Sequence, residues 1–160
     1  MGVNGTSSKP ALIQGQRPSD YAGDVTVDEA WRVLLEEKDS VLIDVRTNAE
    51  WSFVGVPDTS ALGKELFCIE WQTYPTMTVN EEFATTVAQA LKKVGASEGS
   101  NLFFLCRSGV RSRSAAVAMT AAGFEAAHNV AGGFEGDLDE ERHRGRSNGW
   151  KAAGLPWRQS

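Results

Sequence analysis

Short apolar segments alternate with longer amphipathic segments along this chain. The apolar runs at 41–45, 101–105 and 127–130 are four or five residues long and contain several β-branched or aromatic residues. Runs of this length are typical of strands that are buried on both faces of a parallel sheet. A less distinct run at 66–69 is a fourth candidate strand.

Between these runs, apolar side chains recur every three or four positions, as on the buried face of a helix. Val27, Trp31 and Leu34 illustrate this spacing in the first such segment. The predicted helices span residues 27–38, 48–54, 83–94 and 112–123. The alternation of strands and helices predicts an α/β domain with a central parallel sheet.

Polar residues mark the expected beginnings of three helices. Thr26 with Glu29, and Thr78 with Glu81, have the spacing of a capping box, in which two side chains satisfy backbone N–H groups of the first turn. Ser112 is expected to be the N-cap of the last long helix. These positions set the predicted helix boundaries.

The length of 160 residues is that of one domain with a substantial core. Residues 1–19 are rich in Gly, Ser, Pro and Asn and are predicted to form a disordered polar leader, followed by a single domain over 20–160. No apolar run approaches the roughly 20 residues of a membrane helix, so no membrane association is expected. The polar beginning also lacks the apolar core of a signal peptide, and the cytoplasm is the expected location.

Charge and cysteine usage exclude several functional classes. The net charge of −5 argues against general nucleic-acid binding. Two cysteines, Cys68 and Cys106, are too few for a disulfide-rich scaffold or a four-cysteine zinc site. His128 and His143 do not have metal-ligand spacing with either cysteine. We therefore expect no metal and no cofactor.

The segment that carries candidate chemistry is Cys106–Ser112, with the sequence Cys-Arg-Ser-Gly-Val-Arg-Ser between a predicted strand and a predicted helix. Gly109 allows backbone N–H groups to converge, and the helix N-terminus adds partial positive charge. Arg107 and Arg111 add full positive charges, and Arg113 is a weaker candidate than these two for binding an anion. Such surroundings stabilise a bound anion and a thiolate, which is the nucleophilic form of cysteine. Cys106 is therefore the candidate nucleophile.

Each cysteine also has a purely structural interpretation. Free cysteine is often an inert core residue. The arginines and the glycine around Cys106 favour reactivity instead. Nothing comparable surrounds Cys68, so core packing is favoured there over a resolving role in disulfide formation.

Several motifs, taken together and in order, resemble the single-domain form of the rhodanese-like sulfurtransferase family across most of residues 21–157. They are Leu42–Arg46 followed by Glu50-Trp51, the turn Gly55-Val56-Pro57, the loop Cys106–Ser112, the segment Asn129–Phe134 and the closing segment Gly149–Trp157. The turn departs from the family pattern because it lacks a histidine and a second glycine. The segment 61–79 is longer than in compact members and is a candidate for the pocket rim.

The resemblance implies a rhodanese-like sheet with helices on both faces, and it implies sulfur transfer. Cys106 would take a sulfane sulfur from a small anionic donor such as thiosulfate, hold it as a persulfide, and pass it to cyanide, a thiol or a partner protein. The residues expected to bind the donor and the persulfide are Arg107, Ser108, Gly109, Val110, Arg111 and Ser112.

The resemblance also places Asp44 and Arg46 beside the loop in supporting roles. Asp44 is expected to accept hydrogen bonds from the loop, and Arg46 is expected to pair with Glu50. Aromatic side chains are candidates for the pocket wall, although core packing is the commoner role: Trp51, Trp71 and Tyr74.

Two other functions fit parts of this pattern. Cysteine phosphatases and arsenate reductases use a cysteine and an arginine in a similar anion-binding loop, but with five residues between them. Here four residues separate Cys106 from Arg111, which leaves space for a sulfur rather than a tetrahedral phosphate. A non-catalytic binding or regulatory module is the second alternative, because a fold does not by itself establish function.

Overall fold

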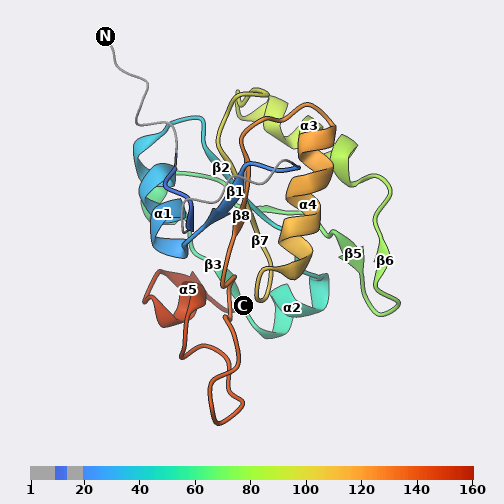
Figure 1. Ribbon diagram of the computed structural model, residues 1–160. Helices are drawn as coiled ribbons and strands as arrows, with labels where there is room; N and C mark the ends of the chain where they lie inside the picture. Colours follow the sequence, from blue (N-terminus) through green and yellow to red (C-terminus); the bar gives the residue numbers. More distant parts are fainter. Residues whose placement is uncertain (1–9, 14–19) are drawn as a thin grey trace.

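The computed structural model describes residues 10–13 and 20–160. Its centre is a five-stranded parallel sheet with the strand order β1-β8-β7-β2-β4 (Figure 1). The strands are β1 Gly23–Val25, β2 Val41–Asp44, β4 Phe67–Cys68, β7 Leu102–Leu105 and β8 Ala127–Val130. The predicted parallel sheet is confirmed, and the three apolar runs are its inner strands.

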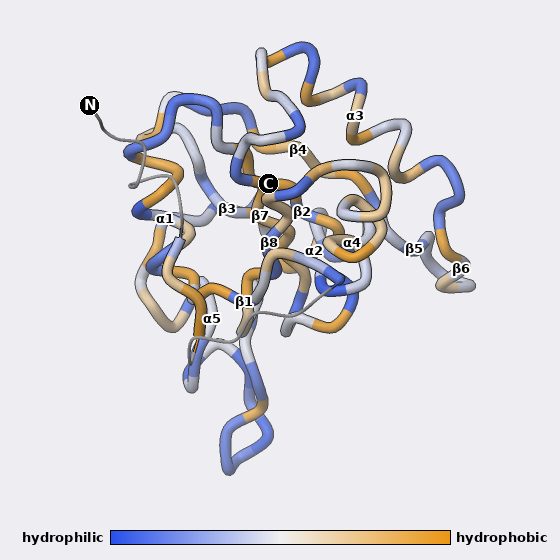
Figure 2. Tube along the Cα trace, turned by 45° about the horizontal axis from the view of Figure 1, so that its top comes forward, coloured by the Kyte–Doolittle hydropathy of each residue, from blue (hydrophilic) through white to orange (hydrophobic). Residues whose placement is uncertain are grey.

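Helices cover both faces of this sheet because successive side chains of each strand point to opposite faces. On one face, Ile43 and Phe104 pack in a cluster with α3 (Phe83–Lys93) and α4 (Val110–Ala121). On the other face, Leu42 and Phe103 pack with α1 (Val27–Glu36) and α5 (Gly149–Ala152). The predicted α/β class with helices on both faces is confirmed. Figure 2 shows the central strands as predominantly apolar.

The register of the inner strands brings three chain segments to one edge of the sheet. Asp44 at the end of β2 is aligned with Leu105 at the end of β7, and Phe104 is aligned with Asn129 of β8. In a parallel sheet the carboxyl ends of the strands lie together, and ligands bind beyond them. Cys106, which follows β7 directly, therefore lies at the edge expected for a site.

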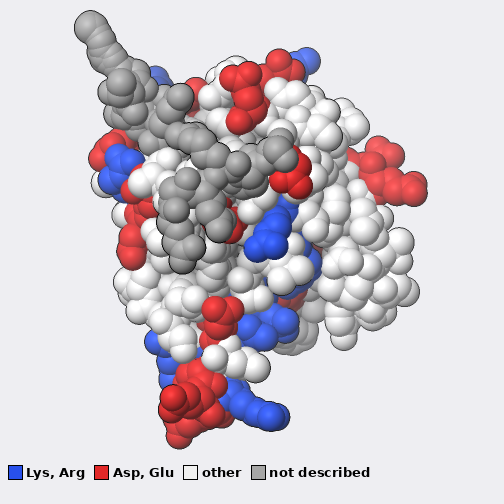
Figure 3. Space-filling view, in the orientation of Figure 1, with Lys and Arg blue, Asp and Glu red and all other residues white. Residues whose placement is uncertain are grey.

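Small elements surround this edge. Helix α2 (Asn48–Phe53) follows β2, and a 3-10 turn, η3, occupies Ser60–Leu62. Strands β3 (Val56–Pro57) and β9 (Trp157–Arg158) pair antiparallel, as do β5 (Gln72–Thr73) and β6 (Thr78–Val79). The loop between β8 and α5 projects from the domain and carries many acidic and basic side chains (Figure 3).

The helix caps agree only in part with the sequence. Thr26 accepts a hydrogen bond from the Glu29 N–H group, and an unpredicted capping box joins Thr47 and Glu50 at α2. The capping box predicted at 78–81 is wrong. Thr78 pairs with Thr73 in the β5–β6 hairpin, so it is not available to cap α3.

The predicted leader falls mostly outside the described residues, since residues 1–9 and 14–19 are not described. Within 10–13, Leu12 packs against the cluster beneath α1, and the Ala11 N–H group donates to the Glu29 carboxylate over 2.8 Å.

In the described part of the chain, no helix is long and apolar enough to cross a membrane.

Candidate active site

Cys106 lies at the floor of the site, in the turn between β7 and α4. Its side chain is only 1% exposed. The sulfur accepts hydrogen bonds from the Gly109 backbone N–H group at 3.1 Å and from the Ser112 hydroxyl at 3.2 Å. These two donors would stabilise negative charge on the sulfur.

Gly109 gives the loop its shape. It is the N-cap of α4 and has a φ angle of 116°, a left-handed conformation that glycine adopts readily. Because α4 begins at Val110, the prediction that Ser112 is the N-cap is wrong. Ser112 lies within the first turn, where its hydroxyl faces the sulfur rather than the helix end.

The loop is also held from behind by residues 133–136. The Cys106 carbonyl accepts a hydrogen bond from the Phe134 N–H group, and the Arg107 carbonyl accepts from those of Glu135 and Gly136. A Cβ atom at Gly133 would lie 2.5 Å from the Cys106 carbonyl oxygen, which is a severe clash. A glycine at 133 is therefore needed for this close backbone contact.

A buried polar chain extends from Cys106 to the first strand. The Ser112 hydroxyl lies 2.5 Å from Asn129 Oδ1, and Asn129 Nδ2 donates to the Asp24 carboxylate over 3.0 Å. The Tyr21 hydroxyl donates to the same carboxylate oxygen over 2.8 Å. Burial and this hydrogen bond raise the pKa of Tyr21 to about 12, so the hydroxyl remains a donor near neutral pH. Asp24 thereby fixes the Asn129 amide with its oxygen toward Ser112.

The single Ser112 hydrogen has two possible acceptors, Cys106 Sγ and Asn129 Oδ1. A thiolate is the stronger acceptor because charge-assisted hydrogen bonds exceed neutral ones. When the thiolate forms, the hydroxyl can therefore turn from the amide to the sulfur. No pattern in the sequence indicates this polar chain, since Asn129 and Asp24 belong to separate strands.

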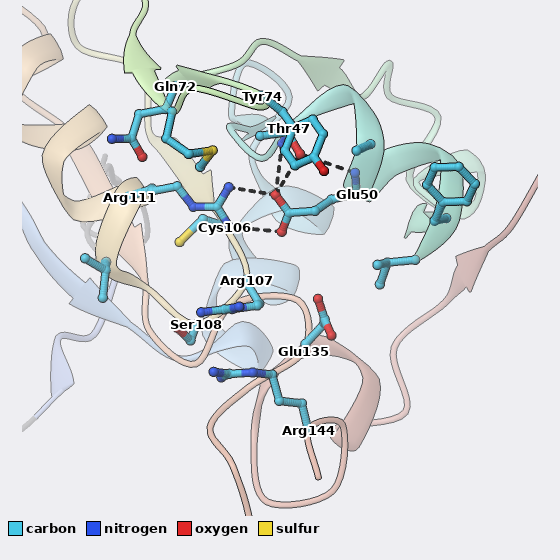
Figure 4. A pocket seen from close by; sticks show the side chains of 15 residues that line it. Thr47, Glu50, Gln72, Tyr74, Cys106, Arg107, Ser108, Arg111, Glu135 and Arg144 are labelled. Atoms are coloured by element: carbon cyan, nitrogen blue, oxygen red, sulfur yellow. Dashed lines mark hydrogen bonds and ion pairs between the residues drawn. The ribbon is translucent and has the colours of Figure 1, made fainter. Parts of the chain in front are cut away.

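Arg111 extends toward the pocket from α4 but is paired with Glu50 of α2 (Figure 4). The two guanidinium nitrogens donate to the two carboxylate oxygens over 2.7 and 2.9 Å. Burial alone would raise the pKa of Glu50, but the hydrogen bonds and charge of Arg111 outweigh it and hold the pKa below its usual value. Burial likewise disfavours the charged Arg111, but Glu50 outweighs it and raises its pKa. Both groups therefore remain ionised at neutral pH.

Arg46 is not the partner of Glu50, and this prediction is wrong. The guanidinium of Arg46 forms a two-pronged ion pair with Asp44, with its shortest contact at 2.7 Å, and also donates to the Gly55 carbonyl. It stacks 4.2 Å above the ring of Phe134. Asp44 accepts from the side chain and backbone N–H of Arg46, so the prediction that it receives bonds from the Cys106 loop is also wrong. Asp44 and Arg46 are only two residues apart in the sequence, which favours this local ion pair.

Three further charged groups line the pocket on the side opposite Gln72 and Tyr74 (Figure 4). Arg107 is exposed, whereas Arg144 is half-buried and donates to the Gly136 carbonyl over 2.7 Å. Glu135 lies between them in the wall. The sequence predicted Arg107, but it missed Arg144 because that residue stands in a charged loop without a distinguishing motif.

The pocket above Cys106 has a volume of about 810 Å³. It lies between α2, the β5–β6 hairpin, the start of α4 and the loop after β8. Among the predicted site residues, those that line it are Cys106, Arg107, Ser108, Val110 and Arg111. Gly109 and Ser112 are buried beneath it. The segment 61–79 contributes to the rim, as expected.

The remaining candidates are divided between the pocket and other parts of the domain. Tyr74 lines the pocket, while Trp71 packs edge-on against Phe83 in the core. Cys68 is exposed on the edge strand β4, so its predicted place in the core is wrong. Among the described residues, one group of side chains is close enough together to ligate a metal ion. It lies in the projecting loop, is mostly exposed, and consists of Asp139, Glu141 and His143.

Comparison with known proteins gives matches along nearly the whole domain. The model of the family described as STR4 middle domain matches residues 22–160. The solved structure of Rv0390 from M. tuberculosis is 48% identical, with a TM-score of 0.75 over 88% of this chain and 99% of that chain. The uncharacterized RP600 homolog of Rickettsia rickettsii is 35% identical over 130 residues, which are 81% of this chain and 91% of the relative.

A more distant match concerns the fold alone. The polysulfide-sulfur transferase homodimer from Wolinella succinogenes is 20% identical, with a TM-score of 0.53 over 86% of this chain and 78% of that chain.

Proposed function

Because this chain belongs to the family of the STR4 middle domain and is a rhodanese-like protein, we propose that it is a sulfurtransferase with Cys106 as its nucleophile. The observation that carries the proposal is the position of the Cys106 sulfur. It lies at the floor of an open pocket and accepts hydrogen bonds from Gly109 and Ser112.

The proposed reaction has two displacement steps and needs no external oxidant or reductant. The Cys106 thiolate attacks the outer sulfur of thiosulfate, the S–S bond of the donor breaks, and sulfite leaves with the bonding electron pair. This leaves a persulfide on Cys106. A nucleophilic acceptor then attacks the outer persulfide sulfur, and Cys106 departs as the thiolate.

The surroundings of the sulfur suit an anionic intermediate. The outer sulfur of the persulfide would meet the N-terminus of α4. The first backbone N–H groups of a helix have no intrahelical acceptors and carry partial positive charge. Val110, Arg111 and Ser112 supply these groups. No metal is required, because the attacking and leaving groups are both sulfur atoms that are stable as anions.

Arg107 is proposed as the main cation for the anionic donor. It is exposed in the pocket wall, and no carboxylate partner is found for it in the described part of the chain. Arg111 also faces the pocket, but Glu50 offsets its charge. We therefore assign Arg111 a secondary part in donor binding.

Mass spectrometry after treatment with thiosulfate tests this proposal. The wild-type protein should gain one sulfur atom, a reductant should remove it, and the Cys106→Ser variant should gain none. Cys68→Ser is the matched control and should still gain the sulfur. Failure of the wild-type protein to form the adduct with thiosulfate, polysulfide or mercaptopyruvate would favour the non-catalytic module instead.

A further inference from the structure

Exposed apolar side chains gather at the mouth of the Cys106 pocket. In the described part of the chain, nine large apolar side chains are exposed, and four of them line this one pocket. They are Phe53 (82% exposed), Val110 (75%), Tyr74 (64%) and Met77 (37%). Such a concentration is typical of a surface that binds an apolar group.

These four side chains belong to three separate elements. Phe53 ends α2, Val110 begins α4, and Tyr74 and Met77 lie in the turn of the β5–β6 hairpin. Met77 has a φ angle of 57°, an uncommon conformation for a residue with a side chain. Packing within the domain does not account for these side chains, because they remain exposed and apolar surface in contact with water is unfavourable. We call this set the apolar rim.

The pocket is too large and too apolar for the donor alone. Its volume of about 810 Å³ falls in the range of sites that hold drug-sized organic molecules. A thiosulfate ion is small and fully charged, so it requires Arg107 and the helix N-terminus but gains nothing from apolar side chains. The rim must therefore be explained by the second substrate.

We propose that the sulfur acceptor is a thiol attached to an apolar body, and that the apolar rim binds this body while the thiolate reaches the Cys106 persulfide. The inference rests on the proposed sulfurtransferase function. In the transfer step the acceptor thiolate attacks the outer persulfide sulfur, a new S–S bond forms on the acceptor, and the bond to Cys106 breaks. Cys106 retains the electron pair as a thiolate.

The charged wall adds a second element of recognition. Arg107 and Arg144 lie on the side opposite Tyr74, with Glu135 as the acidic group between them (Figure 4). After sulfite has left, Arg107 no longer holds the donor. A carboxylate on the acceptor can then bind on this side while the apolar body contacts the rim. A thiol that carries both groups fits the pocket better than cyanide or a small neutral thiol.

The first experiment tests the rim without turnover. In Cys68→Ser protein, Cys106 is alkylated with iodoacetamide and with N-phenyliodoacetamide, and both rates are divided by those for free cysteine. The normalised rate for the phenyl reagent should be about tenfold higher, because its ring binds the rim. The double change Phe53→Ala and Met77→Ala should reduce this preference to about twofold or less.

Leu138→Ala is the matched control, since Leu138 is 52% exposed but does not line the pocket. It should leave the preference unchanged. Equal normalised rates for the two reagents in the wild-type protein would overturn the inference, as would equal losses in the rim and Leu138 variants.

The second experiment distinguishes the source of the thiol. Persulfide-loaded protein is mixed with 2-mercaptoethanol, with 3-mercapto-2-benzylpropanoic acid, or with a tripeptide that has cysteine between two phenylalanines. The last two should be at least tenfold faster relative to their thiolate concentrations, and the rim variant should lose this advantage. A fast tripeptide with a slow mercapto acid would point to a protein acceptor, and the reverse order to a small molecule.

The two proposals fail in different ways. Loss of the phenyl preference with normal persulfide formation would refute the acceptor class but keep the sulfurtransferase. A phenyl preference in a protein that forms no persulfide would keep the apolar binding site but refute the transfer reaction.

Discussion

The molecule contains two arginine–carboxylate pairs near the same edge of the sheet, and they differ in burial. Arg46 and Asp44 are both 0% exposed, and the cation is also covered by the Phe134 ring. Arg111 and Glu50 are 16% and 20% exposed and face the pocket. The first pair connects β2 to the turn at Gly55, whereas the second connects α2 to the start of α4.

This difference separates a structural role from a functional one. A fully buried pair cannot lose one member without leaving an uncompensated charge in the core. In a pair at a pocket wall, either member can interact with solvent or a ligand in place of the other at a small cost in free energy. We therefore expect Arg46 and Asp44 to determine stability, and Arg111 and Glu50 to adjust the charge that an anionic substrate meets.

The largest expected effect is the loss of Arg46. Arg46→Met should lower the free energy of unfolding by about 3–5 kcal/mol, because the Asp44 carboxylate remains buried without a cation. Urea unfolding measures the change. The double variant Asp44→Leu and Arg46→Met should recover part of the loss, since an apolar pair leaves no buried charge. A loss under about 1 kcal/mol for the single variant would contradict a structural role.

The uncharged pair of Ser112 and Asn129 offers an intermediate case. Ser112→Ala should slow iodoacetamide alkylation of Cys106 at neutral pH by about tenfold, because the thiolate loses one of its two hydrogen-bond donors. It should also lower stability by about 1–3 kcal/mol, since Asn129 Oδ1 is left without its partner. Ser112→Thr, which keeps the hydroxyl, should restore most of the rate. An unchanged rate in Ser112→Ala would show that the hydroxyl does not act on the sulfur.

The Arg111–Glu50 pair at the pocket wall should change substrate binding more than folding. Arg111→Ala should raise KM for thiosulfate by about threefold to tenfold with little change in kcat, because it removes a charge that acts mainly in binding. Glu50→Gln keeps the capping box of α2 but frees the charge of Arg111, so it should lower KM. Steady-state kinetics gives both values. A shift of KM in the same direction in both variants would refute this account.

The smallest effect is the pH dependence that Glu50 contributes. Its pKa is lower in the folded protein than in the unfolded chain, owing to Arg111. As the pH falls below about 4.5, the unfolded chain binds a proton that the folded protein does not, so stability decreases. This contribution is small because the pair is partly open to solvent; it is complete near neutral pH and lost once the pH falls through the folded value. Urea unfolding of wild type and Glu50→Gln at pH 7 and below pH 4.5 should show a smaller decrease in the variant.

The sequence predicted the features that depend on neighbouring residues. The runs at 41–45 and 101–105 predicted strands because burial on both faces requires continuous apolar character. The order of strand, Cys106, Gly109 and helix predicted the position of Cys106 at the edge of the sheet for the same local reason. Family resemblance supplied the expectation of sulfur transfer, which these patterns alone left open.

The features that it missed depend on contacts between distant segments. Glu50 and Arg111 are 61 residues apart, and no periodicity indicates that α2 and α4 meet. The β5–β6 strands have two residues each, too few for an alternating pattern to be visible. Cys68 was misplaced because an apolar run does not reveal that its strand lies at the edge of the sheet, where one side remains open to solvent.

The close contact between Gly133 and the Cys106 carbonyl distinguishes positions that tolerate substitution poorly from positions that tolerate it well. Gly133 is 27 residues from Cys106 in the sequence, yet any larger residue there would displace the Cys106 backbone. Substitutions at this position should therefore be poorly tolerated. The side chains of Phe53 and Tyr74 are 82% and 64% exposed, so close packing of this kind does not restrict them. Under the proposed mechanism, exchanging rim side chains would therefore change which acceptor binds and leave the surroundings of the Cys106 sulfur intact.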